Sequence, residues 1–201
     1  MEKEMGDITN LVLVGVGGQG IILASTILSE AAVLMGFDVK NNEVHGMAQR
    51  GGSVISQIRF GKEVYSPLVS QGSAHFMIAL EKLEALRYIY LCNKETKLIV
   101  NDLEIVPVTV TSGAFDYPID IDAQLTSHFR HIQFIDAQRI ARETGSTRTA
   151  NVVLIGSMSN YLPFEDQIFE KAIANSVKKH YRDMNIDAYY RGKQAVALSR
   201  L

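Results

Sequence analysis

A glycine-rich segment near the N-terminus has the residue types and spacing of a phosphate-binding loop. The segment Gly15-Val16-Gly17-Gly18-Gln19-Gly20 matches the pattern G-x-G-x-x-G and follows the apolar run Leu11-Val12-Leu13-Val14. Glycines allow a tight turn between a strand and a helix and let a ligand approach the backbone closely. The N–H groups at the start of the following helix attract an anion. We therefore expect cofactor binding here, with a turn that binds nothing as the alternative; the glycines concerned are Gly15, Gly17, Gly18 and Gly20.

An acidic residue follows this segment at roughly the distance found in dinucleotide sites. There, a carboxylate about 20 residues further on holds the ribose. Glu43 lies at about this distance, although the preceding Lys40-Asn41-Asn42 is not the usual end of an apolar strand. A free-standing NAD(P)-binding protein or oxidoreductase is therefore one interpretation of the sequence.

A second segment concentrates polar groups and glycines within ten residues. It reads Glu43-Val44-His45-Gly46-Met47-Ala48-Gln49-Arg50-Gly51-Gly52, and it has no sustained apolar periodicity, so we expect a loop between strands. Arg50 could hold a phosphate or carboxylate through two parallel hydrogen bonds, and His45 could act as an acid or base near neutral pH. Alternatively, Arg50 and Glu43 pair with each other and Gly51-Gly52 only permits a turn. The further binding candidates here are Glu43, Gln49, Gly51 and Gly52.

Other candidate positions carry weaker signals. In Thr147-Arg148-Thr149-Ala150-Asn151, Thr149 could cap the helix that follows, while Arg148 and Asn151 could reach a site. His75 opens an apolar run, which favours a histidine satisfied within the fold. Cys92 follows an apolar helical pattern and is expected to be a small buried residue.

Composition excludes several classes of protein. The 201 residues include 20 Lys and Arg against 22 Asp and Glu, a balance too even for a nucleic-acid binder with a basic face. The single cysteine excludes a thiolate-held iron–sulfur cluster or a Cys-rich zinc site within one chain. No apolar run reaches the roughly 18 residues of a membrane span, and we see no signal peptide. We expect a soluble cytoplasmic protein.

Strand and helix patterns alternate along the chain and predict an α/β fold. A single domain over residues 1–201 should form a three-layer α/β/α, Rossmann-like structure with a mostly parallel sheet and C-terminal helices. The expected strands are 11–14, 37–41, 54–60, 75–80, 97–101, 105–110 and 132–136. The expected helices are 21–35, 81–91, 151–161, 165–179 and 188–201.

Together the two glycine-containing segments resemble the gamma-type domain of the 2-oxoacid:ferredoxin oxidoreductases, with the indolepyruvate branch as the nearest match. The pairing of G-x-G-G-Q-G with the Gln49-Arg50-Gly51-Gly52 motif carries the resemblance. Arg148-Thr149-Ala150-Asn151 and Ala188-Tyr189-Tyr190-Arg191-Gly192 extend it over nearly the whole chain.

The resemblance implies oxidative decarboxylation of a 2-oxoacid, which with coenzyme A and oxidised ferredoxin gives an acyl-CoA, carbon dioxide and reduced ferredoxin. It implies that a large (alpha) subunit supplies thiamine diphosphate, Mg²⁺ and [4Fe-4S] clusters, since this chain holds no cofactor alone. Ferredoxin would be reached through the complex, and the isolated chain could form a homodimer. Coenzyme A could contact this chain, with Arg50 binding an anion and Gln19 making a polar contact near the reacting centre.

Overall fold

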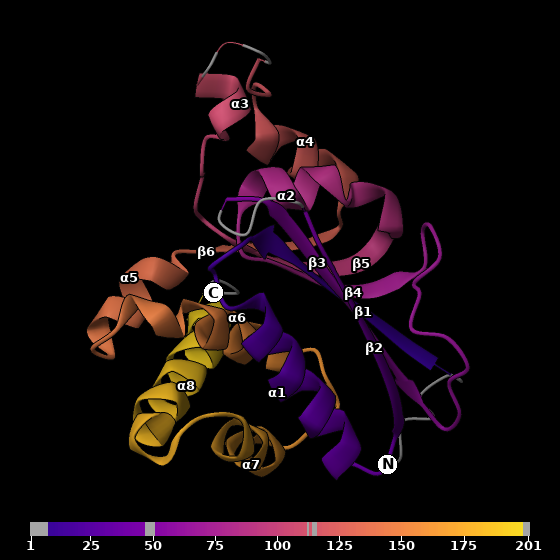
Figure 1. Cartoon of the computed structure of the whole chain (residues 1–201), viewed down its shortest axis with the longest axis vertical. Helices are drawn as coiled ribbons and strands as arrows, with labels where there is room; N and C mark the ends of the chain where they lie inside the picture. The colour runs from indigo at the N-terminus through magenta and orange to yellow at the C-terminus, as the bar shows by residue number, and fades with distance from the viewer. Residues whose placement is uncertain (1–7, 47–50, 112, 114–115, 199–201) are drawn as a thin grey trace.

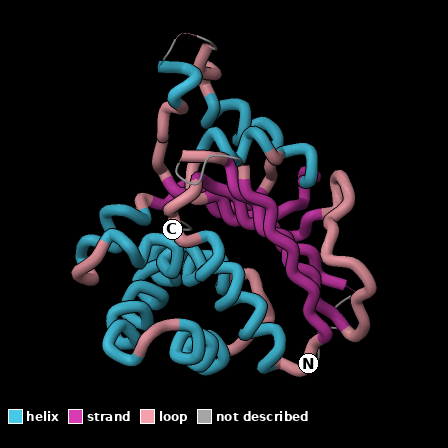
Figure 2. Tube along the Cα trace, in the orientation of Figure 1, coloured by secondary structure: helices cyan, strands magenta, loops and turns pink. Residues whose placement is uncertain are grey.

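A six-stranded sheet runs through the centre of the protein (Figures 1 and 2). The computed structural model describes residues 8–46, 51–111, 113 and 116–198. The strands lie in the order β2-β3-β1-β4-β5-β6. β3 is antiparallel to β1 and β2, whereas the pairs β1–β4, β4–β5 and β5–β6 are parallel, which confirms a mostly parallel sheet. The bounds are β1 Ile8–Val16, β2 Asp38–His45, β3 Ser53–Gly61, β4 Ala74–Ala79, β5 Cys92–Asn101 and β6 His131–Ile135.

Helices cover both faces of this sheet and complete the predicted three layers (Figure 1). One face carries α1 Ile21–Leu34, α5 Ala137–Glu143, α6 Ala150–Ser159, α7 Asp166–Ser176 and α8 Arg182–Leu198. The other carries α2 Lys82–Arg87, α3 Val108–Thr111 and α4 Ile121–His128. Short 3₁₀ segments occupy Ile89–Leu91, Thr147–Thr149 and Lys179–Tyr181.

The apolar run in β1 supplies both halves of the core. Leu11 and Leu13 pack with α1 and α6, while Val12 and Val14 pack with α2 and α4. A strand buried on both faces needs such a continuous apolar sequence, which is why it was recognisable.

Two glycines let α6 cross α8 at close range. A Cβ atom added to Gly156 would lie 1.9 Å from the carbonyl oxygen of Tyr189, and one added to Gly192 would lie 1.9 Å from that of Val153. All of α6 is buried between the sheet and α8, so this crossing fixes the inner helix that starts at the candidate site.

Several local predictions were wrong. Residues 108–111 form helix α3 rather than part of a strand, because Pro107 lacks an N–H and starts a helical turn whose Val110 N–H donates to its carbonyl. The segment expected as a loop from Glu43 begins within a strand, since Glu43 and His45 pair with Ser56 and Val54 of β3. The short helices α4 and α5 were not predicted.

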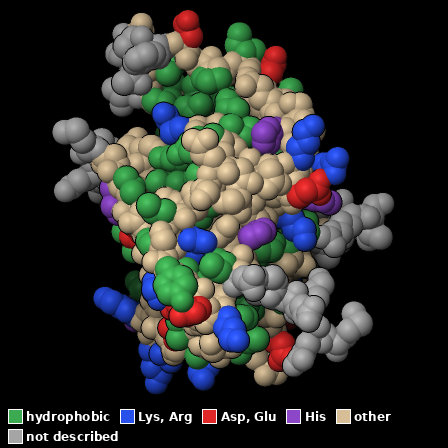
Figure 3. All heavy atoms as spheres, turned by 90° about the vertical axis from the view of Figure 1, so that its right-hand side faces the viewer, with side chains coloured by type: hydrophobic (Ala, Val, Ile, Leu, Met, Phe, Trp, Pro, Cys, Tyr) green, Lys and Arg blue, Asp and Glu red, His purple; other side chains and the backbone are tan. Residues whose placement is uncertain are grey.

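The surface keeps some large apolar side chains exposed. Tyr65 is 83% exposed and Leu68 57% exposed, both between β3 and β4. Figure 3 shows hydrophobic side chains in patches among Lys and Arg on one face of the molecule. Within the described residues no helix is long and apolar enough to cross a membrane.

Candidate functional site

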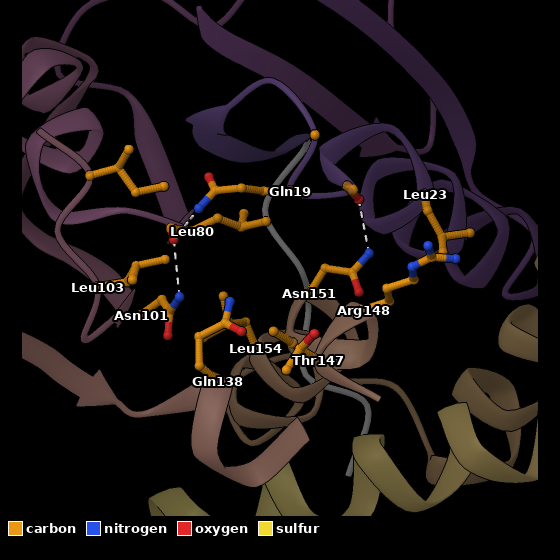
Figure 4. A pocket seen from close by; sticks show the side chains of 14 residues that line it. Gln19, Leu23, Leu80, Asn101, Leu103, Gln138, Thr147, Arg148, Asn151 and Leu154 are labelled. Carbon is orange, nitrogen blue, oxygen red and sulfur yellow. Dashed lines mark hydrogen bonds between the residues drawn. The ribbon is translucent and has the colours of Figure 1, made fainter. Parts of the chain in front are cut away.

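The chain leaves β1 and β4 in opposite directions, which opens a crevice at their carboxyl ends. From β1 it passes through α1 to β2 on one side of the sheet, and from β4 it passes to β5 on the other. Ligands of open α/β sheets bind at such switch points. A cavity of about 440 Å³ lies here, which we call the switch-point cavity (Figure 4). Its lining includes Gly18, Gln19, Gly20, Leu80, Asn101, Leu103, Ile105, Gln138 and Asn151.

Gln19 fills the opening between the two strands with its side-chain amide. The Val16 N–H donates to Oε1 over 2.7 Å, and Nε2 donates to the Leu80 carbonyl over 3.0 Å. The amide therefore joins two backbone groups where the strands separate. Gly15 leaves room for it, because a Cβ there would lie 2.6 Å from Oε1. The amide that we predicted to contact a reacting group thus has both ends engaged within the chain.

Asn101 makes a second amide bridge that the sequence analysis missed. Its Nδ2 donates to the Leu80 carbonyl over 3.1 Å, and its Oδ1 accepts from the Ala137 N–H over 3.1 Å. The side chain is 1% exposed. The available signal was a polar residue ending an apolar strand at the carboxyl edge.

Asn151 connects the start of α6 to the glycine loop. Its Nδ2 donates to the Gly20 carbonyl over 2.9 Å, and its Oδ1 accepts from the Val152 N–H over 2.9 Å. Gly20 has φ +80°, and a Cβ there would lie 2.7 Å from Asn151 Nδ2, so this position requires glycine. The prediction that Asn151 belongs to the site is consistent with this placement, although its amide binds backbone.

The backbone of the glycine loop is open to a ligand. Gly18 has φ +101°, and no atom of a residue that the structure describes lies within 4 Å of a Cβ added there. Among the described residues, no side chain caps the N-terminus of α1, and the first turn of α1 holds no acidic residue. The free N–H groups there carry partial positive charge and suit an anion.

The second predicted segment meets the glycine loop on its other side. The Gly17 N–H donates to the Gly52 carbonyl over 2.8 Å. A cavity of about 660 Å³ lies between the loop and the end of β2, lined by Gly17, Ile22 and His45 among others. His45 Nε2 lies 3.8 Å from a Glu43 carboxylate oxygen. Gly51 has φ +77°, while Gln49 and Arg50 lie outside the described residues.

The strand order disfavours a dinucleotide site. In the fold that binds dinucleotides, the strand carrying the ribose-binding acid lies beside the first strand. Here β3 lies between β1 and β2. This places Glu43 one strand spacing, about 5 Å, further from the glycine loop.

Comparison with known proteins decides the family. The model of the family described as pyruvate ferredoxin/flavodoxin oxidoreductase matches residues 10–195. The chain belongs to this family. It is 41% identical to the indolepyruvate oxidoreductase subunit IorB of Archaeoglobus fulgidus, over 94% of this chain and 96% of the relative. It is 39% identical to IorB of Thermococcus kodakarensis, over 92% and 95%.

Solved structures share the fold of this family member. The gamma subunit of a keto/oxoacid ferredoxin oxidoreductase from Geobacter sulfurreducens superposes with a TM-score of 0.70 at 20% identity, covering 94% of this chain and 99% of that one. A 2-oxoglutarate:ferredoxin oxidoreductase from Magnetococcus marinus gives 0.75 at 17% identity, over 96% of this chain but 32% of that one. In the latter protein, the same fold is therefore part of a longer chain.

Two buried charged residues, Glu81 and Lys82, bind the backbone of the segment that forms the apolar wall of the cavity in this family member. Glu81 is 1% exposed and accepts the Ile105 N–H over 3.0 Å. Burial raises the pKa of the Glu81 carboxyl above its usual range. The Lys82 N–H donates to the Leu103 carbonyl over 3.0 Å.

The Lys82 ammonium forms ion pairs with carboxylates on two other segments of the chain. It lies 2.7 Å from Asp102 and 2.9 Å from Asp122. Burial acts to lower the pKa of Lys82, but the hydrogen bonds to these two carboxylates outweigh it and raise the pKa. Sequence spacing gave no signal for this cluster, because its carboxylates come from separate elements.

The single cysteine of this chain does not fit an iron–sulfur cluster, and its described residues do not fit a metal ion. Clusters need several thiolates, and Cys92 is buried, with its thiol 3.8 Å from the Met77 sulfur. Burial raises the pKa of Cys92 to about 12. In the part of the chain that the structure describes, no group of three His, Cys, Asp or Glu side chains could hold a metal ion.

Proposed function

We propose that this chain is the small subunit of an indolepyruvate:ferredoxin oxidoreductase. The observation that carries the proposal is its 41% identity to an IorB subunit over nearly the full length of both chains. Identity to a 2-oxoglutarate synthase subunit KorC of Methanothermobacter marburgensis is 28%. This difference favours an arylpyruvate over 2-oxoglutarate as the substrate. The reaction would convert the 2-oxoacid and coenzyme A to an acyl-CoA and carbon dioxide, with the electrons passing to ferredoxin.

A larger alpha subunit would complete the enzyme. It would hold thiamine diphosphate, Mg²⁺ and the [4Fe-4S] clusters, which supply the carbanion chemistry and the electron path. The single buried cysteine of this chain supports that division. Ile22 and Val44, 53% and 52% exposed, lie beside the glycine loop and at the end of β2, where the partner would cover them. We place the complex in the cytoplasm and expect it to pass electrons to ferredoxin.

The residues of this chain would bind and orient coenzyme A at the carboxyl edge of the sheet. The open backbone at Gly18 and the uncapped start of α1 support a contact with one of its phosphates. Gln19, Asn101 and Asn151 would act as positioning residues, because their amides fix the walls of the switch-point cavity. The related Magnetococcus marinus protein was solved with coenzyme A bound. Arg50 remains our candidate for a second anion contact, and Gln49 and His45 remain candidates from the same segment of the sequence.

Substitution of Arg50 in the reconstituted complex tests this assignment. Loss of one charge-assisted hydrogen bond should raise the KM for coenzyme A about tenfold in Arg50→Ala. Lys62→Ala is the matched control, because Lys62 is exposed in the turn after β3, at the opposite edge of the sheet. Unchanged turnover and unchanged coenzyme A dependence in Arg50→Ala would remove Arg50 from the site.

A further inference from the structure

A third cavity adjoins the switch-point cavity, between α1, the turn before α6 and the connection from α7 to α8. Its volume is about 520 Å³. We call it the rear cavity. Among the described residues, only Leu23 and Arg148 line both cavities, so these two side chains form the partition. The other lining residues used below are Val177, Lys178, Tyr181 and Asn185.

Two cations face the rear cavity without a partner. Neither Arg148 nor Lys178 makes a side-chain hydrogen bond or ion pair with any described residue, and no carboxylate is among the described residues of the lining. Figure 4 shows the Arg148 guanidinium beside Leu23, directed away from Gln19 and Asn101. By contrast, Arg139 and Arg191 nearby are both paired with Glu143. The rear cavity therefore presents positive charge that is free to meet an anion.

The remaining lining is suited to an aromatic ring with a hydrogen-bond donor. Leu23, Val177 and Tyr181 supply apolar surface. Asn185 is 5% exposed, and its Nδ2 donates to the Tyr181 carbonyl over 2.8 Å. Its Oδ1 accepts no hydrogen bond from any residue that the structure describes. This oxygen is therefore free to accept from a ligand in the cavity, and a ligand N–H or O–H fits this position.

We propose that the rear cavity binds an aromatic carboxylate that carries an N–H or O–H donor on its ring. The carboxylate lies between Arg148 and Lys178, the ring packs on Leu23 and Tyr181, and the donor reaches Asn185 Oδ1. A volume of about 520 Å³ is within the usual range for small-molecule sites. The site lies within this chain and across the partition from the switch-point cavity. Its occupancy does not depend on the proposed function.

Calorimetric titration of the isolated chain with indole-3-acetate tests the proposal. Indole-3-acetate supplies the carboxylate, the ring and the N–H, phenylacetate lacks the donor, and tryptamine replaces the carboxylate with a cation. We expect indole-3-acetate to bind, phenylacetate to bind about fivefold more weakly for the loss of one hydrogen bond, and tryptamine to give no signal. Equal affinity for all three, or no binding of indole-3-acetate at millimolar concentration, overturns the proposal.

Adjacent lysines provide a matched pair of variants. Lys178→Gln should weaken indole-3-acetate binding up to about fivefold, the range of a solvent-exposed ion pair. Lys179→Gln should leave it unchanged, since Lys179 is exposed and outside the lining. The same loss in both variants contradicts a specific site. Displacement of indole-3-acetate by coenzyme A would assign the rear cavity to the coenzyme and would also overturn the proposal. The Arg50→Ala assay described above tests the proposed function separately, because its outcome does not depend on these titrations.

Discussion

Replacing Gln19 with Met should destabilise the protein by leaving backbone groups unpaired at the switch point. Methionine keeps the length of the side chain but neither accepts from the Val16 N–H nor donates to the Leu80 carbonyl. Val16 is 8% exposed, so its N–H has little access to water. An orphaned buried donor costs about 1–3 kcal/mol and the lost bond to Leu80 about 1 kcal/mol. The Leu80 carbonyl keeps its bond from Asn101. We expect the free energy of unfolding to fall by about 2–4 kcal/mol, which lowers Tm by roughly 5–15 °C for a chain of this size.

Thermal and urea unfolding of the isolated chain measure this loss, with Gln138→Met as the control. Gln138 lines the same cavity and makes no side-chain hydrogen bond with the described residues. Gln19→Glu adds a sharper test. Its carboxylate would still accept from Val16 but would face the Leu80 carbonyl, and protonation restores a donor. The folded state thus favours the protonated acid, so this variant should lose stability as pH rises from 5 to 8. A Gln19→Met variant no less stable than Gln138→Met would refute the bridging role.

Three further predictions concern other parts of the fold. Gly192→Ala should lower the free energy of unfolding by at least the roughly 1–3 kcal/mol of an overpacked core, because the added Cβ would lie 1.9 Å from the Val153 carbonyl oxygen. Urea unfolding measures this loss, with Gln194→Ala at an exposed position as the control. Equal stability of the two variants would contradict the prediction. His75 Nδ1 accepts the Asn10 N–H over 2.9 Å, and partial burial lowers the pKa of His75. The neutral form therefore stabilises the fold above pH 6.5, and this contribution is lost as pH falls. His75→Gln should therefore show a smaller drop in Tm between pH 7 and 5, and an unchanged drop would exclude His75. Cys92, whose thiol pKa is raised to about 12, should react with iodoacetamide only on unfolding; rapid labelling of the folded chain would contradict its burial.

The sequence was most informative where one element alone determines its own structure. The run ending at Val14 is apolar at every position, so a buried strand followed by the glycine turn was predictable without tertiary information. The Gly17–Gly52 hydrogen bond shows that the second glycine-containing segment lies against the first.

Other features depend on pairing between distant residues and were not predictable. Strand β2 lies at the edge of the sheet, and its end carries polar residues such as Glu43. Backbone pairing with β3 keeps this end of β2 extended although its sequence lacks apolar periodicity. The roles of Gln19 and Asn101 depend on the separation of β1 and β4, which sequence spacing does not report. The role of Glu81 was also not predictable, because its carboxylate accepts from the backbone N–H of Ile105, which lies 24 residues further along the chain.

Reconstitution with the large subunit tests the central claim most directly. The measurement is reduction of ferredoxin with an arylpyruvate and coenzyme A, made on this chain alone, on the large subunit alone and on the co-purified complex. The account predicts arylpyruvate- and coenzyme A-dependent reduction by the complex and none by this chain alone. Oxidation of a 2-oxoacid by the isolated chain, or tight binding of NAD or NADP to it, would contradict the account.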